Sequence, residues 1–193
     1  MLRQSLFLVA LALAVPVPAQ AAIELAGARF AREATAGGER LALRGAALFE
    51  WRSLIKAYAA ALYLPPDAPS SAALADVPKR LEISYFRAID ADSFGRAADA
   101  LLRRTLAPEQ EAPLRERLDE LHARYEPVAP GDRYALTYQP GVGTELAKNG
   151  RPLALVPGAD LAAAYFALWL GPDPVDVQLR DRLLGDAKTR APN

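Results

Sequence analysis

The feature of this chain that most restricts its fold is an almost uninterrupted apolar segment from Leu54 to Leu64, in which Lys56 is the only charged residue. Pro65 and Pro66 follow directly and end the segment, because proline cannot donate a backbone hydrogen bond. A strand that is apolar on both faces has to be covered on both faces, which places it inside a sheet. The alanines of the segment also permit a helix, but its tyrosines and isoleucine favour a central strand.

Strand patterns occur on both sides of this segment. We expect strands where apolar residues alternate between turn residues, at 28–34, 39–43, 79–86, 134–138, 144–148 and 151–156. Gly37-Gly38 and Asn149-Gly150 predict hairpin turns between the first two and the last two of these strands.

Helical patterns follow the strand at 79–86 and the strand at 151–156. Their expected starts are at Asp90 or Asp92, at Pro108, at Asp160 and at Asp173-Pro174, and the last helix is expected to end at Gly185. Strands thus come first, then a pair of helices, then more strands and more helices. This order predicts an α+β fold with an antiparallel-rich sheet.

The first residues have the order of parts found in a secretory signal peptide. Arg3 gives a positive start, residues 6–15 form an apolar run too short to span a bilayer, and Ala19-Gln20-Ala21 matches a small-x-small cleavage pattern. We therefore expect a signal peptide at residues 1–21, cleavage near Ala21, and one periplasmic or secreted domain over residues 22–193. An uncleaved anchor or a buried helix is the alternative. No second apolar stretch is long enough for a membrane span.

Composition removes several classes of function. The chain has no cysteine, which excludes thiol catalysis and thiolate metal sites. Its single histidine, His122, argues against most zinc sites and against a Ser-His-Asp hydrolase. The 23 basic and 23 acidic residues are balanced without a basic run, so nucleic-acid binding has little support. We expect neither a metal nor a cofactor.

Two short features have weak chemical interpretations. His122 lies at the edge of an amphipathic stripe, where it would act as a general base or ligand or, as we favour, would be a boundary histidine on a helix surface. Gly141-Val142-Gly143 resembles the start of a phosphate loop but lacks the third glycine, so a tight turn is favoured. No catalytic residue is assigned.

Polar residues within or beside the apolar segment are more informative. These residues are Lys56, Tyr58 and Tyr63 in the segment and Arg52 just before it. They mark either a cleft or anion site, because buried charge is costly unless paired, or a strand end whose charges reach solvent. Both interpretations stay open, and a register slip of one residue would turn Arg52 outward.

The segment at 56–68 (KAYAAALYLPPDA) resembles the central strand of chalcone-isomerase-like proteins. Further motifs occur in the order of that family: Gly131-Asp132, residues 138–144 (YQPGVGT), Lys148-Asn149-Gly150, Pro157-Gly158, residues 167–171 (ALWLG) and Pro174-Val175-Asp176. The resemblance covers nearly all of residues 22–193, and the motifs at 167–171 and 174–176 are similar to those of exported bacterial members. It implies an open-faced β-sandwich, a large antiparallel sheet with helices layered on one face and a ligand cleft between them.

The plant isomerases of this family use an arginine anion trap, a strand threonine, a tyrosine with an asparagine seven residues on, and a late-helix hydroxyl. By resemblance the threonine corresponds to Tyr58, the tyrosine to Phe94, the asparagine to Leu101, the late hydroxyl to Ala162, and the arginine to Arg52 or, second, Arg44. Up to three polar groups are therefore apolar here. Because losing one such donor costs roughly 3 kcal/mol in an enzyme, the pattern favours binding over turnover.

The resemblance thus implies a non-catalytic protein that binds an apolar carboxylate such as a fatty acid, with Arg52 pairing with the head group and Tyr58 adding a hydrogen bond. One alternative is an isomerase or lyase on an unknown substrate that retains Arg52 and Tyr58. The other is a ligand-free interaction protein whose cleft is filled by Phe94, Leu101 and Phe166. The sequence identifies neither the ligand nor a protein partner.

Overall fold

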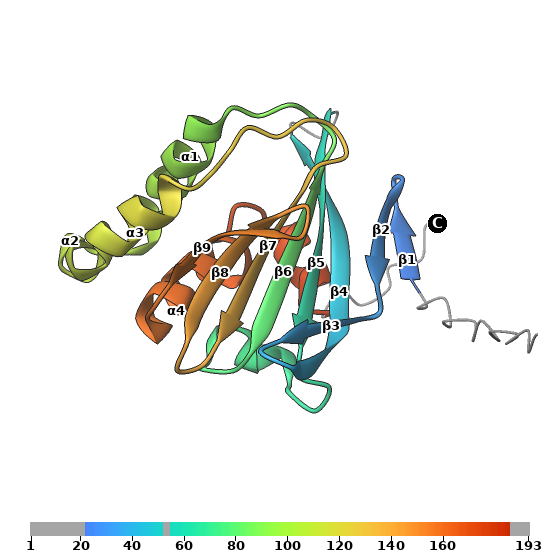
Figure 1. Cartoon of the computed structure of the whole chain (residues 1–193), viewed down its shortest axis with the longest axis horizontal. Coiled ribbons are helices and arrows are strands. Elements are labelled where there is room, and N and C mark those ends of the chain that lie inside the picture. Colours follow the sequence, from blue (N-terminus) through green and yellow to red (C-terminus); the bar gives the residue numbers. More distant parts are fainter. Residues whose placement is uncertain (1–21, 52–54, 186–193) are drawn as a thin grey trace, which may run out of the picture.

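The computed structural model describes residues 22–51 and 55–185, and an antiparallel sheet lies at the centre of this part of the chain (Figure 1). Its strands follow one another in sequence order: β3 (Glu33–Ala36), β4 (Glu39–Trp51), β5 (Ile55–Leu64), β6 (Lys79–Tyr85), β7 (Arg133–Gln139), β8 (Gly143–Lys148) and β9 (Arg151–Val156). A separate hairpin is formed by β1 (Ala22–Leu25) and β2 (Ala28–Ala31). The signal peptide predicted at residues 1–21 lies outside the described residues, and so does Arg52.

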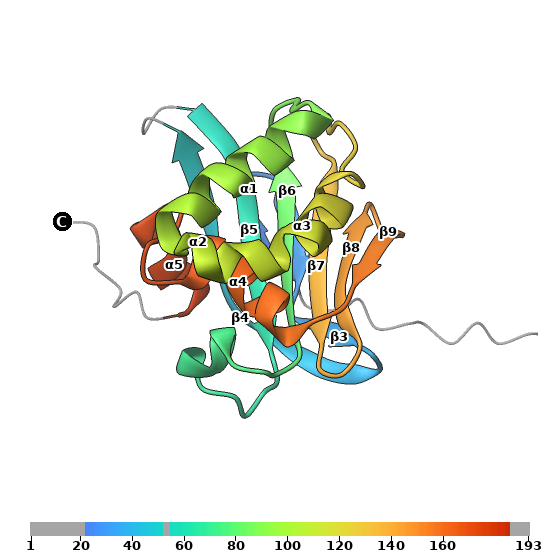
Figure 2. The same cartoon turned by 90° about the vertical axis from the view of Figure 1, so that its left-hand side faces the viewer.

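The helices gather on one face of this sheet (Figures 1 and 2). They are α1 (Ala91–Thr105), α2 (Pro108–Glu111), α3 (Arg115–His122), α4 (Ala159–Leu170) and α5 (Val177–Leu183), with short 3₁₀ turns at Ser70–Leu74 and Ala112–Leu114. The α+β fold class and the layering of helices on one face are therefore confirmed. Within the described residues, no helix combines the length and the apolar character needed to cross a membrane.

Strand β5 confirms the central strand that its composition predicts, because its two faces belong to two separate cores. Leu62 and Leu64 face the helices and join the large core beneath them. Ala61 and Tyr63 face the other way and pack in a smaller core with Phe30 of β2. All five side chains are fully buried, so both apolar faces of β5 are covered by other parts of the chain.

The second core is closed by the β1–β2 hairpin, which Arg133 of β7 ties to the sheet. The Arg133 guanidinium lies 4.7 Å from the ring centroid of Phe30. Its Nη2 donates to the carbonyl oxygen of Arg29 at 2.6 Å, and its Nη1 donates to Glu82 Oε2 at 2.7 Å. A charged residue thus covers an aromatic ring and anchors the hairpin at the same time.

Both predicted hairpin turns are confirmed, since Ala36 pairs with Glu39 and Lys148 with Arg151. The tight turn predicted at 141–143 also lies between two paired strands, β7 and β8.

Two helix predictions need correction. The helix expected from Pro108 is divided into α2, a 3₁₀ turn and α3, because Pro113 lies in its middle and has no N–H to continue the ladder. The last helix begins at Val177 rather than directly after Asp173, and its cap is Asp176, whose Oδ1 accepts from the backbone N–H of Leu179 at 2.7 Å.

Candidate functional site

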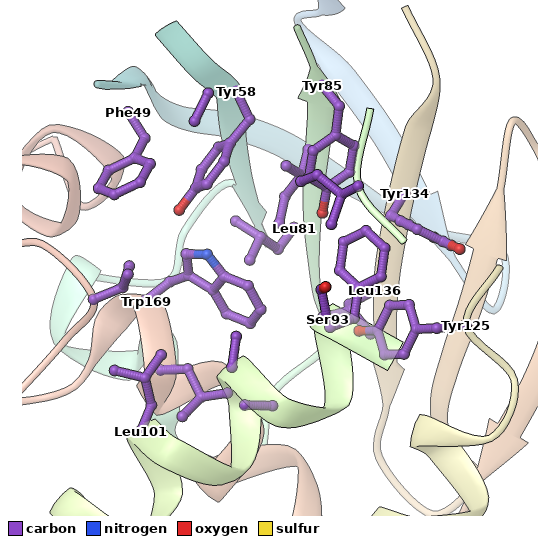
Figure 3. Close-up of a pocket in the computed structure, with 18 of the residues that line it drawn as sticks. Phe49, Tyr58, Leu81, Tyr85, Ser93, Leu101, Tyr125, Tyr134, Leu136 and Trp169 are labelled. Atoms are coloured by element: carbon purple, nitrogen blue, oxygen red, sulfur yellow. The ribbon is translucent and has the colours of Figure 1, made fainter. Parts of the chain in front are cut away.

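A cavity of about 740 Å³ lies between the sheet and the helix layer (Figure 3). Strands β4 to β7 form its floor, α1 and α4 form its walls, and the residues around Ile89, Tyr125 and Val175 complete it. The lining residues are Phe49, Trp51, Ala57, Tyr58, Leu81, Ile83, Tyr85, Ile89, Ser93, Phe94, Ala97, Ala98, Leu101, Tyr125, Tyr134, Leu136, Tyr165, Leu168, Trp169 and Val175. None of these described lining residues carries a charge. The cavity is therefore apolar and aromatic, with side-chain polar atoms supplied by hydroxyl groups and by the indoles of Trp51 and Trp169.

Tyr58 lies on β5 at one side of the cavity. Its ring stacks on Phe49 of the neighbouring strand, with centroids 4.9 Å apart and planes inclined by 28°. Figure 3 shows the indole nitrogen of Trp169 directed toward the Tyr58 hydroxyl, and this neighbour lowers the Tyr58 pKa by less than burial raises it. Burial raises the pKa of Tyr58 far above the usual value for tyrosine, so the hydroxyl stays protonated at neutral pH.

The opposite side of the cavity is a group of packed rings that includes Tyr85, Phe94, Tyr125 and Tyr134. Phe94 stacks on Tyr125 at 4.8 Å, and Tyr85 meets Phe94 edge-on at 5.6 Å. Phe94 is in the first turn of α1 and Tyr125 follows the end of α3, so this group joins both helices to β6 and β7.

Most hydroxyl groups of these tyrosines have protein partners. The Tyr125 and Tyr165 hydroxyl oxygens lie 3.0 Å apart and share a hydrogen bond. The Tyr134 hydroxyl accepts from the backbone N–H of Glu126 at 2.8 Å and donates to the carbonyl oxygen of the same residue at 2.7 Å. Tyr85 differs: its side chain is 5% exposed, and its hydroxyl has no hydrogen-bond partner among the described residues.

The structure brings three of the residues proposed by resemblance to the cavity. Tyr58, Phe94 and Leu101 all line it. Ala162 does not, because it lies on α4 with its side chain buried in the core. Arg52 lies outside the described residues, but its neighbour Trp51 lines the cavity.

Arg44 is separated from the described cavity lining. Its Nη2 donates to the carbonyl oxygen of Ala68, and its backbone and side chain lie next to Gly185 beyond α5. Lys56, the charged residue of the central strand, is exposed to solvent. Of the two interpretations of that charge, its exposure favours a strand end that reaches water.

His122 and Phe166 also lie apart from the cavity lining. Nδ1 of His122 is 3.6 Å from Asp99 Oδ1, and burial lowers the pKa of the ring, so it is neutral at pH 7. This placement fits the boundary histidine that we favour. Phe166 is fully buried, with its ring centroid 5.6 Å from Lys79 Nζ. Within the described residues, no group of three or more histidine and acidic side chains could hold a metal ion.

The sequence did not single out Tyr85, Tyr125, Tyr165 or Trp169 as site residues. Tyr85 and Tyr125 lie on apolar faces that the sequence indicates, where aromatic residues are usually core. What distinguishes these residues is that aromatic side chains from several strands and helices gather between the sheet and the helices. This gathering can be seen only in the folded structure.

Comparison with known proteins finds one matching family model and a set of matching solved structures. A family model described as chalcone isomerase-like matches residues 22–185. Among solved structures, the crystal structure of a fatty-acid binding protein from Arabidopsis thaliana matches with a TM-score of 0.65 and 16% sequence identity, over 86% of this chain and 97% of that chain. At this identity the structural likeness shows the fold. No curated protein matches the sequence.

Proposed function

Because this chain belongs to the chalcone isomerase-like family, we propose that it is a binding protein that holds an apolar carboxylate such as a fatty acid in the cavity. The observation that carries the proposal is the cavity itself, whose volume of about 740 Å³ is within the range of small-molecule sites. Its aromatic and aliphatic lining favours a hydrocarbon body, because burial gains about 25 cal/mol for each Å² of apolar surface. The fatty-acid binding protein of the same fold adds support.

The chemistry of the lining supports binding rather than turnover. An isomerase or lyase needs donors aimed at developing negative charge, and a group that moves a proton near neutral pH. The Tyr58 hydroxyl is kept protonated by burial, and Phe94, Leu101 and Ala162 offer no side-chain donor at the positions that the resemblance assigns. Turnover that requires the Tyr58 hydroxyl, observed with an enone substrate, would argue for the isomerase alternative instead.

The cavity also supports binding over a ligand-free interaction role. Filling by Phe94, Leu101 and Phe166 is the expectation of that alternative. Phe94 and Leu101 instead line open space, and Phe166 is packed in the core.

We propose that the carboxylate end of the ligand lies near the β4–β5 connection. Trp51 at the end of β4 lines the cavity, and Arg52 follows it in sequence. A guanidinium is well suited to pair with a carboxylate, because it offers several donors in one plane.

Export remains part of the proposal. It rests on the charged start, the short apolar run and the small-x-small pattern of residues 1–21. The N-terminal sequence of the protein isolated from the periplasm or medium should begin near Ala22. A chain that retains Met1 and stays in the cytoplasm would contradict export without affecting the binding proposal.

The binding proposal is tested by native mass spectrometry of the protein isolated from its own cells, with extraction and identification of any bound lipid. We expect a stoichiometric fatty acid or similar amphiphile. An unliganded mass that persists after incubation with fatty acids would contradict the proposal.

A matched pair of variants on α1 sharpens this test. Ala97 lines the cavity and is exposed, whereas Ala100 is exposed but does not line it. Ala97→Trp should place a large ring in the cavity and reduce the bound fraction strongly. Ala100→Trp should retain the ligand, because its added ring points away from the cavity lining.

A further inference from the structure

The Tyr85 hydroxyl is the exception in the hydrogen-bond pattern of the cavity. The Tyr58 hydroxyl faces the indole of Trp169, the Tyr125 hydroxyl is hydrogen-bonded to that of Tyr165, and the Tyr134 hydroxyl is hydrogen-bonded to the backbone of Glu126. Tyr85 is just as deeply buried, yet none of the described residues pairs with its hydroxyl. Figure 3 shows the Tyr85 ring entering from β6 with its oxygen directed into the interior of the cavity.

The Tyr85 oxygen is not among the fully buried side-chain atoms that lack a partner, so it has surface open to the cavity, where it can pair with whatever occupies that space. Tyr85 is held in this position by its neighbours. It is the register partner of Tyr58 on β5, and its ring makes edge contacts with Phe94 at 5.6 Å and Tyr134 at 6.0 Å. Because these contacts hold the ring in place, the hydroxyl is presented to whatever occupies the cavity.

We propose that the Tyr85 hydroxyl donates a hydrogen bond to an uncharged oxygen of the bound ligand and so selects ligands that carry such an oxygen. This inference rests on the proposed function, since it concerns the ligand of the same cavity. It adds a specificity-determining residue that the family resemblance does not assign.

The surroundings of Tyr85 indicate that the oxygen is uncharged. The described residues that line the cavity include no arginine, lysine or histidine to balance a negative charge. Moving an unpaired carboxylate into such an apolar site is costly, and the group takes up a proton instead. Burial also raises the pKa of Tyr85 well above its usual value, so the hydroxyl acts as a donor at neutral pH.

Two kinds of ligand supply this oxygen. One is a carboxylic acid whose head group is bound at Tyr85 in its protonated form. The other is a chain that carries a carbonyl or hydroxyl oxygen at this depth, with or without a carboxylate near the β4–β5 connection. The shared chemistry is an uncharged acceptor surrounded by hydrocarbon.

The test uses three ten-carbon probes: n-decane, 2-decanone and decanoate. Affinities are measured by headspace partitioning for the hydrocarbon and by isothermal titration calorimetry for the other two. They are compared for the wild-type protein, Tyr85→Phe and Tyr63→Phe. Tyr63 is a matched control, because it is a fully buried tyrosine with an unpartnered hydroxyl in the core on the far side of the sheet.

We expect Tyr85→Phe to weaken 2-decanone binding about tenfold, the value of one buried hydrogen bond, and to leave n-decane binding unchanged or tighter. Tyr63→Phe should change neither affinity. Equal affinities of 2-decanone for wild type and Tyr85→Phe would overturn the inference while leaving the binding function intact. Failure of the wild-type protein to bind any probe would overturn both.

Decanoate separates the two sources of the oxygen. If its head group lies at Tyr85, its affinity should fall about tenfold for each pH unit above about pH 5, because only the protonated acid binds, and Tyr85→Phe should weaken it as it weakens the ketone. If the carboxylate lies near the β4–β5 connection, its affinity should not vary between about pH 6 and pH 8, and Tyr85→Phe should affect the ketone alone. Each result supports the inference for one source.

Discussion

Single residues in this molecule place polar groups inside apolar surroundings, and Lys79 on β6 is the clearest case. Its side chain is 1% exposed, and its Nζ donates to the carbonyl oxygen of Ala75 at 2.5 Å. The ammonium lies 5.1 Å from the ring centroid of Tyr138 and 5.6 Å from that of Phe166. These contacts offset part of the cost of burying the charge. The sequence drew attention to Lys56, which is exposed, because local pattern does not show which lysine the tertiary fold will cover.

Lys79 makes stability depend on pH in the alkaline range. Burial lowers its pKa from 10.5 to about 8. Between these values the unfolded chain binds more protons than the folded one, so the free energy of unfolding should rise with pH from about pH 8 to about pH 9.5. Urea unfolding at a series of pH values measures this slope. Lys79→Met should abolish it, whereas Lys56→Met should keep it; a slope that persists in Lys79→Met would assign it to another group.

Arg52 gives a second prediction at this scale. If its guanidinium pairs with the ligand head group, Arg52→Ala should weaken decanoate binding about tenfold at neutral pH, the value of a charge-assisted hydrogen bond. The affinity for 2-decanone should change much less. Calorimetric titration of both probes checks this. An equal loss for the two probes would remove the head-group role from Arg52.

Among the elements, α5 and β4 meet at unusually close range. Strand β4 has a register shift between Leu43 and Gly45. A Cβ at Gly45 would lie 2.1 Å from the carbonyl oxygen of Arg182 and 2.6 Å from that of Leu183. The backbone of α5 therefore rests directly on the strand.

Gly45→Ala should destabilise the protein by about 3 kcal/mol, because backbone atoms of α5 have to move. Gly38→Ala is the comparison: Gly38 has a φ of +85° but open space around it, so about 1 kcal/mol of backbone strain is expected. Denaturant unfolding of both variants gives the two free energies. If Gly45→Ala lowered the free energy of unfolding less than Gly38→Ala does, the backbone of α5 would be able to shift away from the strand at little cost.

The elements also show what sequence can predict. Alternation and turn residues indicated most of the strands, because a pleated strand repeats every two residues whatever it packs against. The strand expected at 28–34 is instead divided into β2 and β3, which belong to different sheets, and the one expected at 39–43 continues to Trp51. The division of the helix at Pro113, the cap at Asp176 and the register shift at Gly45 depend on neighbours distant in sequence. In the site, Tyr58, Phe94 and Leu101 reach the cavity as the resemblance implies. Ala162 does not, because α4 is apolar nearly all round and its pattern does not show which face is open.

For the whole molecule, the tyrosines act together. All seven have raised pKa values: Tyr58, Tyr63, Tyr85, Tyr125, Tyr134, Tyr138 and Tyr165. Burial is the largest cause in each case. For Tyr138, the pKa is raised to about 12. The folded state therefore holds phenol protons that the unfolded chain would release.

Above about pH 10 this difference should destabilise the fold, because the unfolded chain loses tyrosine protons first and stability falls as pH rises toward the folded-state pKa values. We expect tyrosinate absorbance to appear in one cooperative step that coincides with loss of the circular dichroism signal. Separate, non-cooperative ionisation of most tyrosines near pH 10 in a folded protein would contradict this expectation. A bound ligand should move the step to higher pH, since it stabilises the folded state.

The two cores on either side of β5 have a consequence for how such a protein changes over generations. The core beneath the β1–β2 hairpin contains Phe30, Leu41 and Tyr63 and is closed, whereas the one beneath the helices contains the cavity. A substitution that reshapes the cavity leaves the closed core intact, so the chain retains a reserve of stability while its ligand preference drifts. If the proposed binding function holds, the fold can therefore be kept while the bound molecule changes from one relative to another.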